Sequence, residues 1–230
     1  DVAPTIDMLP DDAKAILEIG SGSGRLTIPI AQSGRAVTAL DNSYSAIEKL
    51  KVRSQALGLS DKIRAIECDV ASYEEPAFYD AVMLVGLSVH VMELGTVRGA
   101  IDLAKRMLTS DGRFCLNIFS DGSEDIFTRM MPEEGSVSLY LYRDENEEQR
   151  IIISSGRYNP ITREITQNWI IQANDGMIHA ATMISNLWRP SDITQIILDA
   201  GFREVKEEMH RFGDTDITES VRVAFLTAII

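Results

Sequence analysis

The sequence predicts an α/β fold in which helices cover both faces of a parallel sheet and an antiparallel β segment is added to that sheet. Over the first 120 of 230 residues, short apolar runs alternate with stretches of helical periodicity. Strands joined by helices pair in parallel through crossovers, which leaves the helices on both faces. From about residue 136 the alternation stops, and strand-like runs follow one another with only turn signals between them.

The parallel part is expected to contain five strands and three helices. The expected strands are Lys14–Ile19, Ala36–Leu40, Ile63–Glu67, Ala81–Val85 and Arg113–Phe119, and the helices between them are Arg25–Gln32, Ser45–Leu57 and Glu93–Leu108. Pro29 is tolerated because it lies near the first turn of its helix. Ser43 to Ser45 offers an N-cap to the second helix, and Ser110 to Gly112 is expected to close the third.

The added segment is expected to form an antiparallel ribbon or small sheet. Its four strands are Val137–Tyr142, Arg150–Tyr158, Glu164–Gln172 and Met177–Trp188, with hairpin turns at Asn159-Pro160 and Asn174-Asp175-Gly176. Pro190 then introduces a helix, Ile193–Ala200, that Gly201 ends. The final strands are Glu204–Phe212 and Val221–Ile230.

Composition excludes several classes of function. The formal net charge is −13 and no stripe of Lys and Arg occurs, which argues against nucleic acid as a partner. No run of apolar residues is long enough to span a membrane. Cys68 and Cys115 lie in apolar strand-like runs without metal-ligand spacing to any histidine, so we expect reduced core thiols, no metal site and a cytoplasmic protein. The chain begins at Asp1 rather than methionine, which leaves a preceding segment open.

The most informative stretch is the turn after the first strand. Residues 18–24 read Glu-Ile-Gly-Ser-Gly-Ser-Gly, directly after an apolar run and before a helical stretch. Glycines allow backbone conformations that other residues resist, and they let a ligand approach the main chain closely. The carboxylate of Glu18 at the strand end suits a ligand that carries an ammonium group better than one that carries a phosphate.

Two more acids and a fourth loop are expected at the same edge of the sheet, where open parallel sheets bind ligands. Asp41 ends the second strand and can accept hydrogen bonds from a ribose diol, although a turn residue is the alternative. Asp69 follows the third strand and can accept from an exocyclic amine, although an N-cap is the alternative. Residues 85–90 follow the fourth strand. Together these positions predict a nucleoside-containing cofactor.

These residues resemble the motifs of the class I S-adenosylmethionine-dependent methyltransferases. The first motif is the acid and alternating glycines of residues 18–24, the second is Asp41, and the third is Asp69-Val70. Residues 79–82 and 108–114 also match the family. The resemblance implies a Rossmann-like seven-stranded methyltransferase sheet, its last strand antiparallel between the fifth and the sixth, with an antiparallel β insertion after the fifth strand. It also implies one domain over residues 1–230, with residues 136–189 as a substrate cover.

The resemblance implies S-adenosyl-L-methionine as the cofactor and places its methionine end at the first turn. The residues concerned are Glu18, Gly20, Ser21, Gly22, Gly24, Val85 and Gly86. Glu18 and the backbone around Gly20 are expected to hold the amino group. Gly22 and Gly24 let the turn pass close to the cofactor, and Val85-Gly86 supplies main chain beside the methionine portion.

The adenosine end is expected at the second and third strand ends. By the resemblance, Asp41 takes the ribose hydroxyls and Asn42 flanks the adenine. Asp69 meets the adenine amine, while the backbone N–H of Val70 meets a ring nitrogen.

The acceptor side is less well marked. His90 is the candidate general base, with a packing histidine as the alternative. The chain further resembles sugar N-methyltransferases and glycine N-methyltransferase at Arg157-Tyr158 and at Trp188-Arg189-Pro190. The tyrosines and tryptophans of this region offer aromatic walls for a pocket or plain packing, and Arg157 and Arg189 could meet an anionic group.

The predicted function is methyl transfer to nitrogen or oxygen of a small-molecule acceptor. One alternative is a noncatalytic S-adenosylmethionine-binding sensor or assembly partner. Another is a nicotinamide-dependent oxidoreductase, although its Gly-x-Gly-x-x-Gly fingerprint would need a glycine where Arg25 stands. A homodimer is left open.

Overall fold

A computed structural model of the chain describes residues 2–74, 78–131, 135–143, 149–172, 176–211 and 222–230. The chain divides into two compact units. The core unit comprises residues 1–120 and 188–230, and the β-sheet unit comprises residues 121–187. The single-domain organisation with a substrate cover at residues 136–189 stays a prediction.

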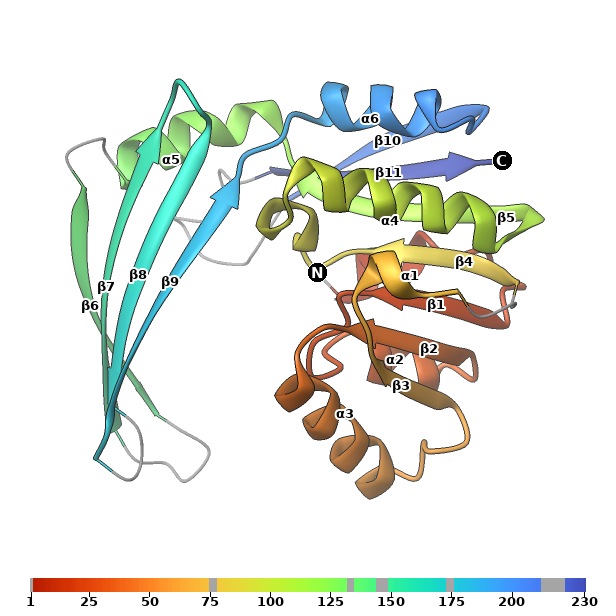
Figure 1. The fold of residues 1–230 in the computed structure, drawn as a ribbon, viewed down its shortest axis with the longest axis horizontal. Coiled ribbons are helices and arrows are strands. Elements are labelled where there is room, and N and C mark those ends of the chain that lie inside the picture. The colour runs from red at the N-terminus through yellow and green to blue at the C-terminus, as the bar shows by residue number, and fades with distance from the viewer. Residues whose placement is uncertain (1, 75–77, 132–134, 144–148, 173–175, 212–221) are drawn as a thin grey trace. The chain divides into compact units, whose positions relative to one another are not determined.

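The core unit is built on a seven-stranded sheet with the order β10-β11-β5-β4-β1-β2-β3 (Figure 1). Its strands are β1 (Ala15–Ile19), β2 (Ala36–Asp41), β3 (Ile63–Glu67), β4 (Tyr79–Leu84), β5 (Leu108–Phe119), β10 (Glu204–Arg211) and β11 (Arg222–Ile229). Strands β1 to β5 pair in parallel, and β11 pairs antiparallel with both β5 and β10. The predicted sheet, with its last strand inserted between the fifth and the sixth, is confirmed.

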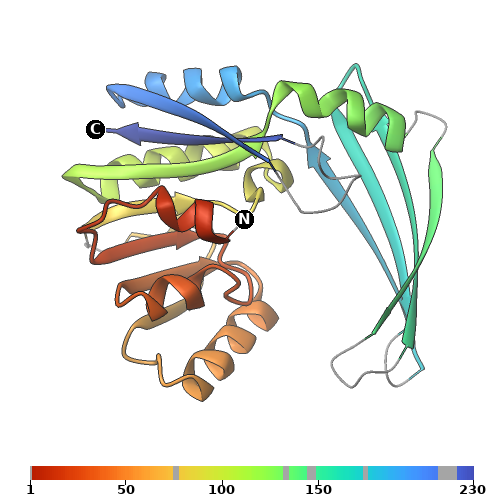
Figure 2. The ribbon, with the colours of Figure 1, turned by 180° about the vertical axis from the view of Figure 1, so that it is seen from behind.

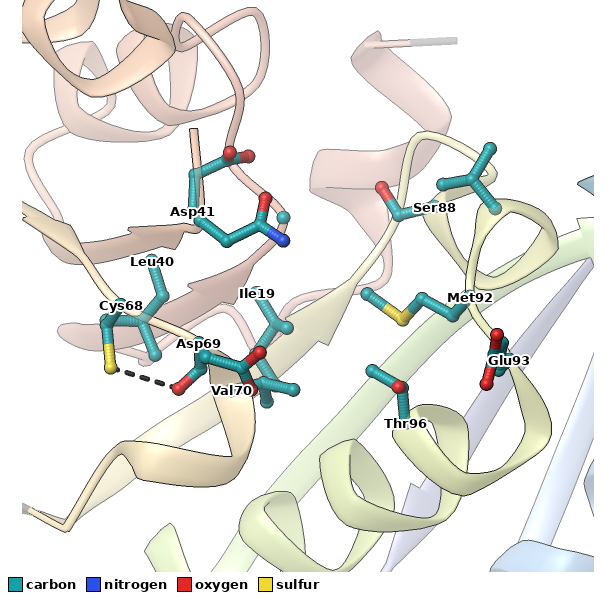
Figure 3. A pocket seen from close by; sticks show the side chains of 13 residues that line it. Ile19, Leu40, Asp41, Cys68, Asp69, Val70, Ser88, Met92, Glu93 and Thr96 are labelled. Carbon is teal, nitrogen blue, oxygen red and sulfur yellow. Dashed lines mark hydrogen bonds between the residues drawn. The ribbon is translucent and has the colours of Figure 1, made fainter. Parts of the chain in front are cut away.

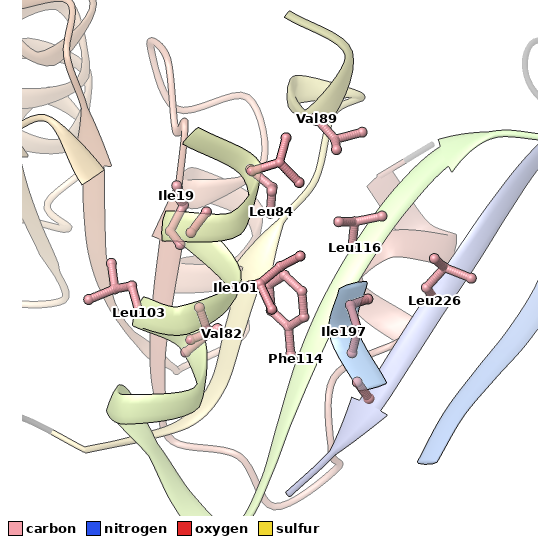
Figure 4. Packing of buried hydrophobic residues seen from close by; sticks show 14 of the residues in the cluster. Ile19, Val82, Leu84, Val89, Ile101, Leu103, Phe114, Leu116, Ile197 and Leu226 are labelled. Atoms are coloured by element: carbon pink, nitrogen blue, oxygen red, sulfur yellow. The ribbon is translucent and has the colours of Figure 1, made fainter. Parts of the chain in front are cut away.

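Helices cover both faces of this sheet because its strands are apolar on both sides. The helices of the core unit are α1 (Val2–Asp7), α2 (Thr27–Gln32), α3 (Tyr44–Ala56), α4 (Leu94–Met107) and α6 (Pro190–Asp199). Leu17 and Ile19 of β1 pack in one cluster with α4 and α6 (Figure 4), whereas Ile16 packs in another with α1, α2 and α3. This alternation is the pattern of a strand buried on both faces.

The ends of the helices follow their sequence signals, with one exception. The Ser43 side chain accepts a hydrogen bond from the N–H of Ala46, and Pro190 begins α6. The expectation that Ser110 to Gly112 closes a helix is wrong: α4 ends at Met107, and the three residues lie within β5. Leu108 already pairs with Tyr79 of β4, so β5 begins directly after the helix. The next pair is Ala81 with Arg113, and residues 109–112 form an irregularity in the register between β4 and β5.

The β-sheet unit contains a four-stranded antiparallel sheet with the order β6-β7-β8-β9 (Figure 2). Its strands are β6 (Ser136–Arg143), β7 (Gln149–Asn159), β8 (Glu164–Gln172) and β9 (Ile178–Asn186), and α5 (Glu124–Met130), which the sequence did not predict, precedes them. The predicted β insertion after the fifth strand is confirmed. Asn159 forms the first expected turn by accepting from the N–H groups of Ile161 and Thr162. The second, at Asn174-Asp175-Gly176, falls largely on residues 173–175, outside the described residues.

Within the described ranges, every helix is too short or too polar to cross a membrane.

Candidate functional site

The carboxyl ends of β1 to β4 lie at one edge of the core sheet and border a cavity of about 430 Å³ (Figure 3). It is lined by Ile19, Gly20, Leu40, Asp41, Asn42, Cys68, Asp69, Val70, Ser88, Val91, Met92, Glu93 and Thr96. Asp41 and Asp69 lie on one side of it, with Met92 and Thr96 across from them. The predicted adenosine residues are therefore brought together.

A second cavity, of about 310 Å³, shares Gly20 and Ser88 with the first. It is lined by Glu18, Gly20, Ser21, Gly22, Ser23, Arg25, Leu26, Val85, Gly86 and Ser88. The residues that the resemblance assigned to the methionine end lie here, apart from Gly24. We call the two hollows the larger and the smaller cavity.

The glycine turn is tied to the end of β2. The N–H groups of Gly20 and Ser21 both donate to the Leu40 carbonyl, at 2.8 and 2.9 Å. Gly20 has a φ of +73°, a conformation that glycine adopts readily and other residues rarely do. The turn therefore closes sharply over β2 and leaves its main chain at the border of both cavities.

Gly24 serves packing in this structure. Its φ is +89°, and a Cβ built on it would collide with Cδ1 of Leu50 in α3. It is not among the described residues that line either cavity. The close approach that Gly24 permits is between the turn and α3, and its predicted cofactor role stays a prediction.

Glu18 is a buried acid on the smaller cavity. Its side chain is 2 % exposed, and the Thr27 hydroxyl donates to Oε2 at 2.5 Å. Burial raises the pKa of the Glu18 carboxyl to about 7, against the opposing effects of the Thr27 hydrogen bond and the Arg25 charge; the Asp41 charge adds a further increase. A cation in this cavity would therefore stabilise the ionised form of Glu18.

Asp41 is held by the backbone of two turns. Its Oδ2 accepts from the N–H of Gly22 at 2.8 Å, and its Oδ1 accepts from the N–H of Ser43 at 2.8 Å. The turn role considered as the alternative is therefore present. A carboxylate oxygen can accept a second hydrogen bond, so these contacts fix the orientation of Asp41 and leave acceptor capacity for a diol in the larger cavity.

Asp69 also has a local role. Its Oδ1 accepts from the N–H of Ala71 at 2.8 Å and caps the short 3-10 helix η1 (Val70–Ser72). The N-cap alternative is thus confirmed as a contact. Asp69, Val70 and Asn42 all line the larger cavity, so capping and ligand contact are compatible.

His90 is packed into the core unit. It is 3 % exposed, stacks on the Phe119 ring at 4.8 Å between centroids, and its Nε2 accepts from the N–H of Phe119 at 3.0 Å. It is not among the described residues that line either cavity. This geometry favours the packing alternative, and the role of general base stays a prediction.

The other predicted acceptor residues lie in two units. In the β-sheet unit, Tyr158 is 1 % exposed and donates to Oε1 of Glu124 at 2.6 Å, while Arg157 is exposed on the opposite face of β7. In the core unit, Trp188 is partly buried and donates from Nε1 to the Val89 carbonyl at 3.1 Å. Arg189 is exposed at the start of α6. Their contacts with an acceptor stay predictions.

Sequence reasoning missed several lining residues. Met92, Glu93 and Thr96 line the larger cavity and Arg25 lines the smaller one, whereas Ser88, which lines both, falls within the predicted loop of residues 85–90. The signal for Arg25 was its place directly after Gly24. For Glu93 and Thr96 no signal existed, because the side of a helix N-terminus that faces a cavity depends on its packing.

The residues present fit S-adenosylmethionine. Ser21 lines the smaller cavity together with Glu18, and its Oγ is buried without a hydrogen-bond partner among the described residues. Buried polar atoms are rarely left unpaired in native proteins, so such an atom points to a polar ligand. The larger cavity combines three acids, Asp41, Asp69 and Glu93, with apolar walls that include Ile19, Leu40 and Val70, which suits a nucleoside.

Comparison with known proteins also indicates a methyltransferase. Residues 16–112 match the family model described as "Methyltransferase domain". The chain is 25% identical to ubiquinone biosynthesis O-methyltransferase of Nitrosospira multiformis, over 65% of this chain and 69% of that protein. It is 32% identical to (S)-coclaurine N-methyltransferase of Thalictrum flavum, over 35% of this chain but only 22% of that protein.

Solved structures show the same fold. The methyltransferase CcbJ of Streptomyces caelestis superposes with a TM-score of 0.75 at 16% identity, covering 99% of this chain and 88% of that one. An amino pentose methyltransferase of Micromonospora echinaspora, solved with S-adenosylmethionine bound, has a TM-score of 0.66 at 17% identity, covering 98% and 88%. Residues 16–112 therefore match the methyltransferase domain family, and the motifs, the sheet order and these relatives support a class I S-adenosylmethionine-dependent methyltransferase.

Proposed function

We propose that the protein transfers a methyl group from S-adenosylmethionine to a nitrogen or oxygen atom of a small molecule. The observation that carries the proposal is the edge of the core sheet, where four strand ends gather Glu18, Asp41 and Asp69 around two adjoining cavities. The net charge of −13 disfavours a nucleic-acid acceptor. Relatives named for ubiquinone biosynthesis and for coclaurine support a small acceptor.

In this proposal the residues of the two cavities hold and orient the cofactor. Glu18 binds the ammonium group, Asp41 the ribose hydroxyls, and Asp69 with the Val70 N–H the adenine edge. When bound, S-adenosylmethionine supplies an activated sulfonium methyl group for in-line displacement by the acceptor. Because the methyl donor is already reactive, positioning and exclusion of water are the main tasks of this chain.

A general base is needed only where the acceptor must lose a proton. We retain His90 as the candidate, with Arg157, Tyr158, Trp188 and Arg189 as candidate acceptor contacts. To act as a base through Nε2, His90 would have to release the N–H of Phe119. The proposal also places the protein in the cytoplasm, which the two free thiols of Cys68 and Cys115 support. A homodimer remains a prediction that sedimentation velocity would test.

The test combines binding with turnover. Isothermal titration with S-adenosylmethionine is followed by transfer of labelled methyl groups to a panel of amines, phenols and amino sugars. Methylation of a panel member supports the proposal. Absence of binding at millimolar ligand contradicts it, and binding without turnover across the panel favours the noncatalytic sensor.

A matched pair of variants controls the experiment. Asp41 and Asp80 each accept two backbone N–H groups, but Asp80 does so from Lys14 and Ala15 at the opposite end of β1. The proposal expects Asp41→Asn to weaken cofactor binding and Asp80→Asn to leave it unchanged.

A further inference from the structure

The loop after β4 is shared by the two cavities. It lines the smaller cavity with Val85, Gly86 and Ser88, and the larger one with Ser88, Val91, Met92 and Glu93. Figure 3 shows Ser88 and Met92 across the larger cavity from Asp41. The shape of this loop therefore sets one wall of the candidate cofactor site.

The loop begins with a strained backbone conformation. Gly86 and Leu87 have φ values of +72° and +62°, so two successive residues are left-handed just before the short 3-10 helix η2 (Ser88–Val91). Glycine adopts this conformation readily, whereas a residue with a Cβ, such as Leu87, does so at a cost in free energy. Such strain persists only where the surrounding structure holds it, and it is found preferentially at functional sites.

A buried amide on β5 holds this conformation. β5 continues past Leu84, the last residue of β4, so on that side Asn117 faces the loop. Asn117 is 2 % exposed, and its Oδ1 accepts from the N–H of Leu87 at 2.9 Å. The amide therefore fixes the peptide group at the strained position itself.

The second half of the loop is held by separate contacts. The N–H of Phe119 donates to Nε2 of His90 at 3.0 Å, and Nε1 of Trp188 donates to the Val89 carbonyl at 3.1 Å. These contacts fix η2 but do not involve Leu87. Asn117 therefore acts on the first half of the loop.

Ser88 shows why the conformation of Leu87 matters for the cavities. Its Oγ donates to the Val85 carbonyl at 2.8 Å and lies 3.1 Å from the point where a Cβ on Gly20 would sit. Ser88 is thus fitted against the glycine turn, where the two cavities adjoin. A change of Leu87 to a negative φ would rotate the following peptide and move Ser88 away from this position.

We propose that Asn117 is a positioning residue of the cofactor site, which holds Leu87 in its strained conformation and thereby keeps Ser88 at the border of the two cavities. This inference rests on the proposed function. Asn117 is not among the described residues that line either cavity, so its effect on binding runs through the loop. Without the acceptor at position 117 the strain favours a relaxed loop, and cofactor binding must then restore the strained one, which lowers the affinity.

The test compares two substitutions of the same shape. Asn117→Leu removes the acceptor, whereas Asn117→Asp keeps an oxygen in place of Oδ1. Cys115→Ala is the matched control, because Cys115 is buried on the same face of β5 but its thiol donates to the carbonyl of Met8. Where Asn117→Leu does not fold, Asn117→Ala also removes the acceptor and takes its place.

Two measurements are made on each variant, at a temperature where thermal unfolding shows it to be folded. Isothermal titration gives the affinity for S-adenosylhomocysteine. Hydrogen exchange followed by nuclear magnetic resonance, without ligand, gives the opening of the loop at the Leu87 amide.

We expect Asn117→Leu to weaken S-adenosylhomocysteine binding about fivefold or more, as for a lost buried hydrogen bond, and to speed exchange of the Leu87 amide by about the same factor. Asn117→Asp should stay within about threefold of wild type on both measurements, since it keeps the acceptor. Cys115→Ala should lower the midpoint of thermal unfolding and change neither the affinity nor the exchange.

An Asn117→Leu variant that loses stability but binds as wild type overturns the inference, because Asn117 then has a structural role alone. A loss of affinity without faster exchange at Leu87, or an equal loss in Asn117→Asp or Cys115→Ala, also overturns it. Each of these results leaves the proposed function standing. Wild-type protein that binds no S-adenosylhomocysteine at millimolar concentration overturns the proposed function itself, and the inference with it.

Discussion

Gly24 gives a prediction whose size can be worked out from the structure, since a side chain there would meet two separate obstacles. Its φ of +89° disfavours any L-residue, and its added Cβ would collide with Cδ1 of Leu50. Gly34 is the matched control: its φ is +96°, but nothing lies within 4 Å of an added Cβ. Alanine at position 34 meets the first obstacle alone.

The two variants should therefore differ by the cost of the collision. A left-handed conformation costs an L-residue about 1–2 kcal/mol, and overpacking of a close-packed site adds about 1–3 kcal/mol. Gly34→Ala should lose about 1–2 kcal/mol of the free energy of unfolding. Gly24→Ala should lose about 2–5 kcal/mol, because the buried Leu50 side chain must shift away from the added Cβ.

Urea unfolding followed by circular dichroism measures both losses, with the midpoint compared at equal m-value. Losses that agree within about 0.5 kcal/mol, the usual error of such comparisons, would refute the packing role assigned to Gly24. A double variant with Leu50→Ala should recover part of the Gly24→Ala loss, since it removes the colliding atom.

Three further predictions concern the site. Asp41→Asn should weaken S-adenosylhomocysteine binding by about 1.5–3 kcal/mol in isothermal titration, with Asp80→Asn unchanged; equal effects would refute the ribose role. The affinity for S-adenosylhomocysteine should fall as the pH drops below 7, because Glu18 must ionise to hold the ammonium group and its pKa without ligand is about 7. Glu18→Gln should make the affinity less dependent on pH. A wild-type affinity independent of pH between 5.5 and 8 would contradict the role assigned to Glu18. His90→Ala should cost about 1–3 kcal/mol of unfolding free energy, since it removes the buried acceptor of the Phe119 N–H. If His90 is instead the base, the pH–rate profile loses its lower limb while stability changes little.

The fold was predictable because its signals are local. Apolar runs, caps and turn residues indicated every strand of both sheets and the helices α2, α3, α4 and α6. The short helices α1 and α5 were not predicted, because six and seven residues are too few to establish a helical period. Residues 109–112 were misassigned because Leu108 enters the sheet through its pairing with Tyr79, which local sequence does not reveal.

The candidate site was predictable as far as strand ends fix positions. Glu18, Asp41 and Asp69 follow directly from the rule that ligands bind at the carboxyl ends of parallel strands. The partner of a side chain does not follow from that rule. His90 meets Phe119, 29 residues away, and Arg25 reaches Gly86 across two loops. Such contacts depend on how β4 and β5 lie side by side, which the sequence pattern does not specify.

The acceptor side shows a similar limit of sequence patterns. Arg157 and Tyr158 are neighbours on β7 and must point to opposite faces of the sheet. The structure buries Tyr158 against Glu124 and exposes Arg157. The sequence predicts that side chains of β7 alternate between the two faces of the sheet. Which face is buried depends on the packing of α5, which the sequence did not predict.

A crystal structure of the protein with S-adenosylhomocysteine would show directly whether the cofactor binds at the carboxyl ends of β1 to β4. We expect the ribose hydroxyls on Asp41, the adenine beside Asp69 and Val70, and the amino acid end beside Glu18 in the smaller cavity. A ligand bound elsewhere, or bound at this edge of the sheet without contact to Asp41, would contradict this placement.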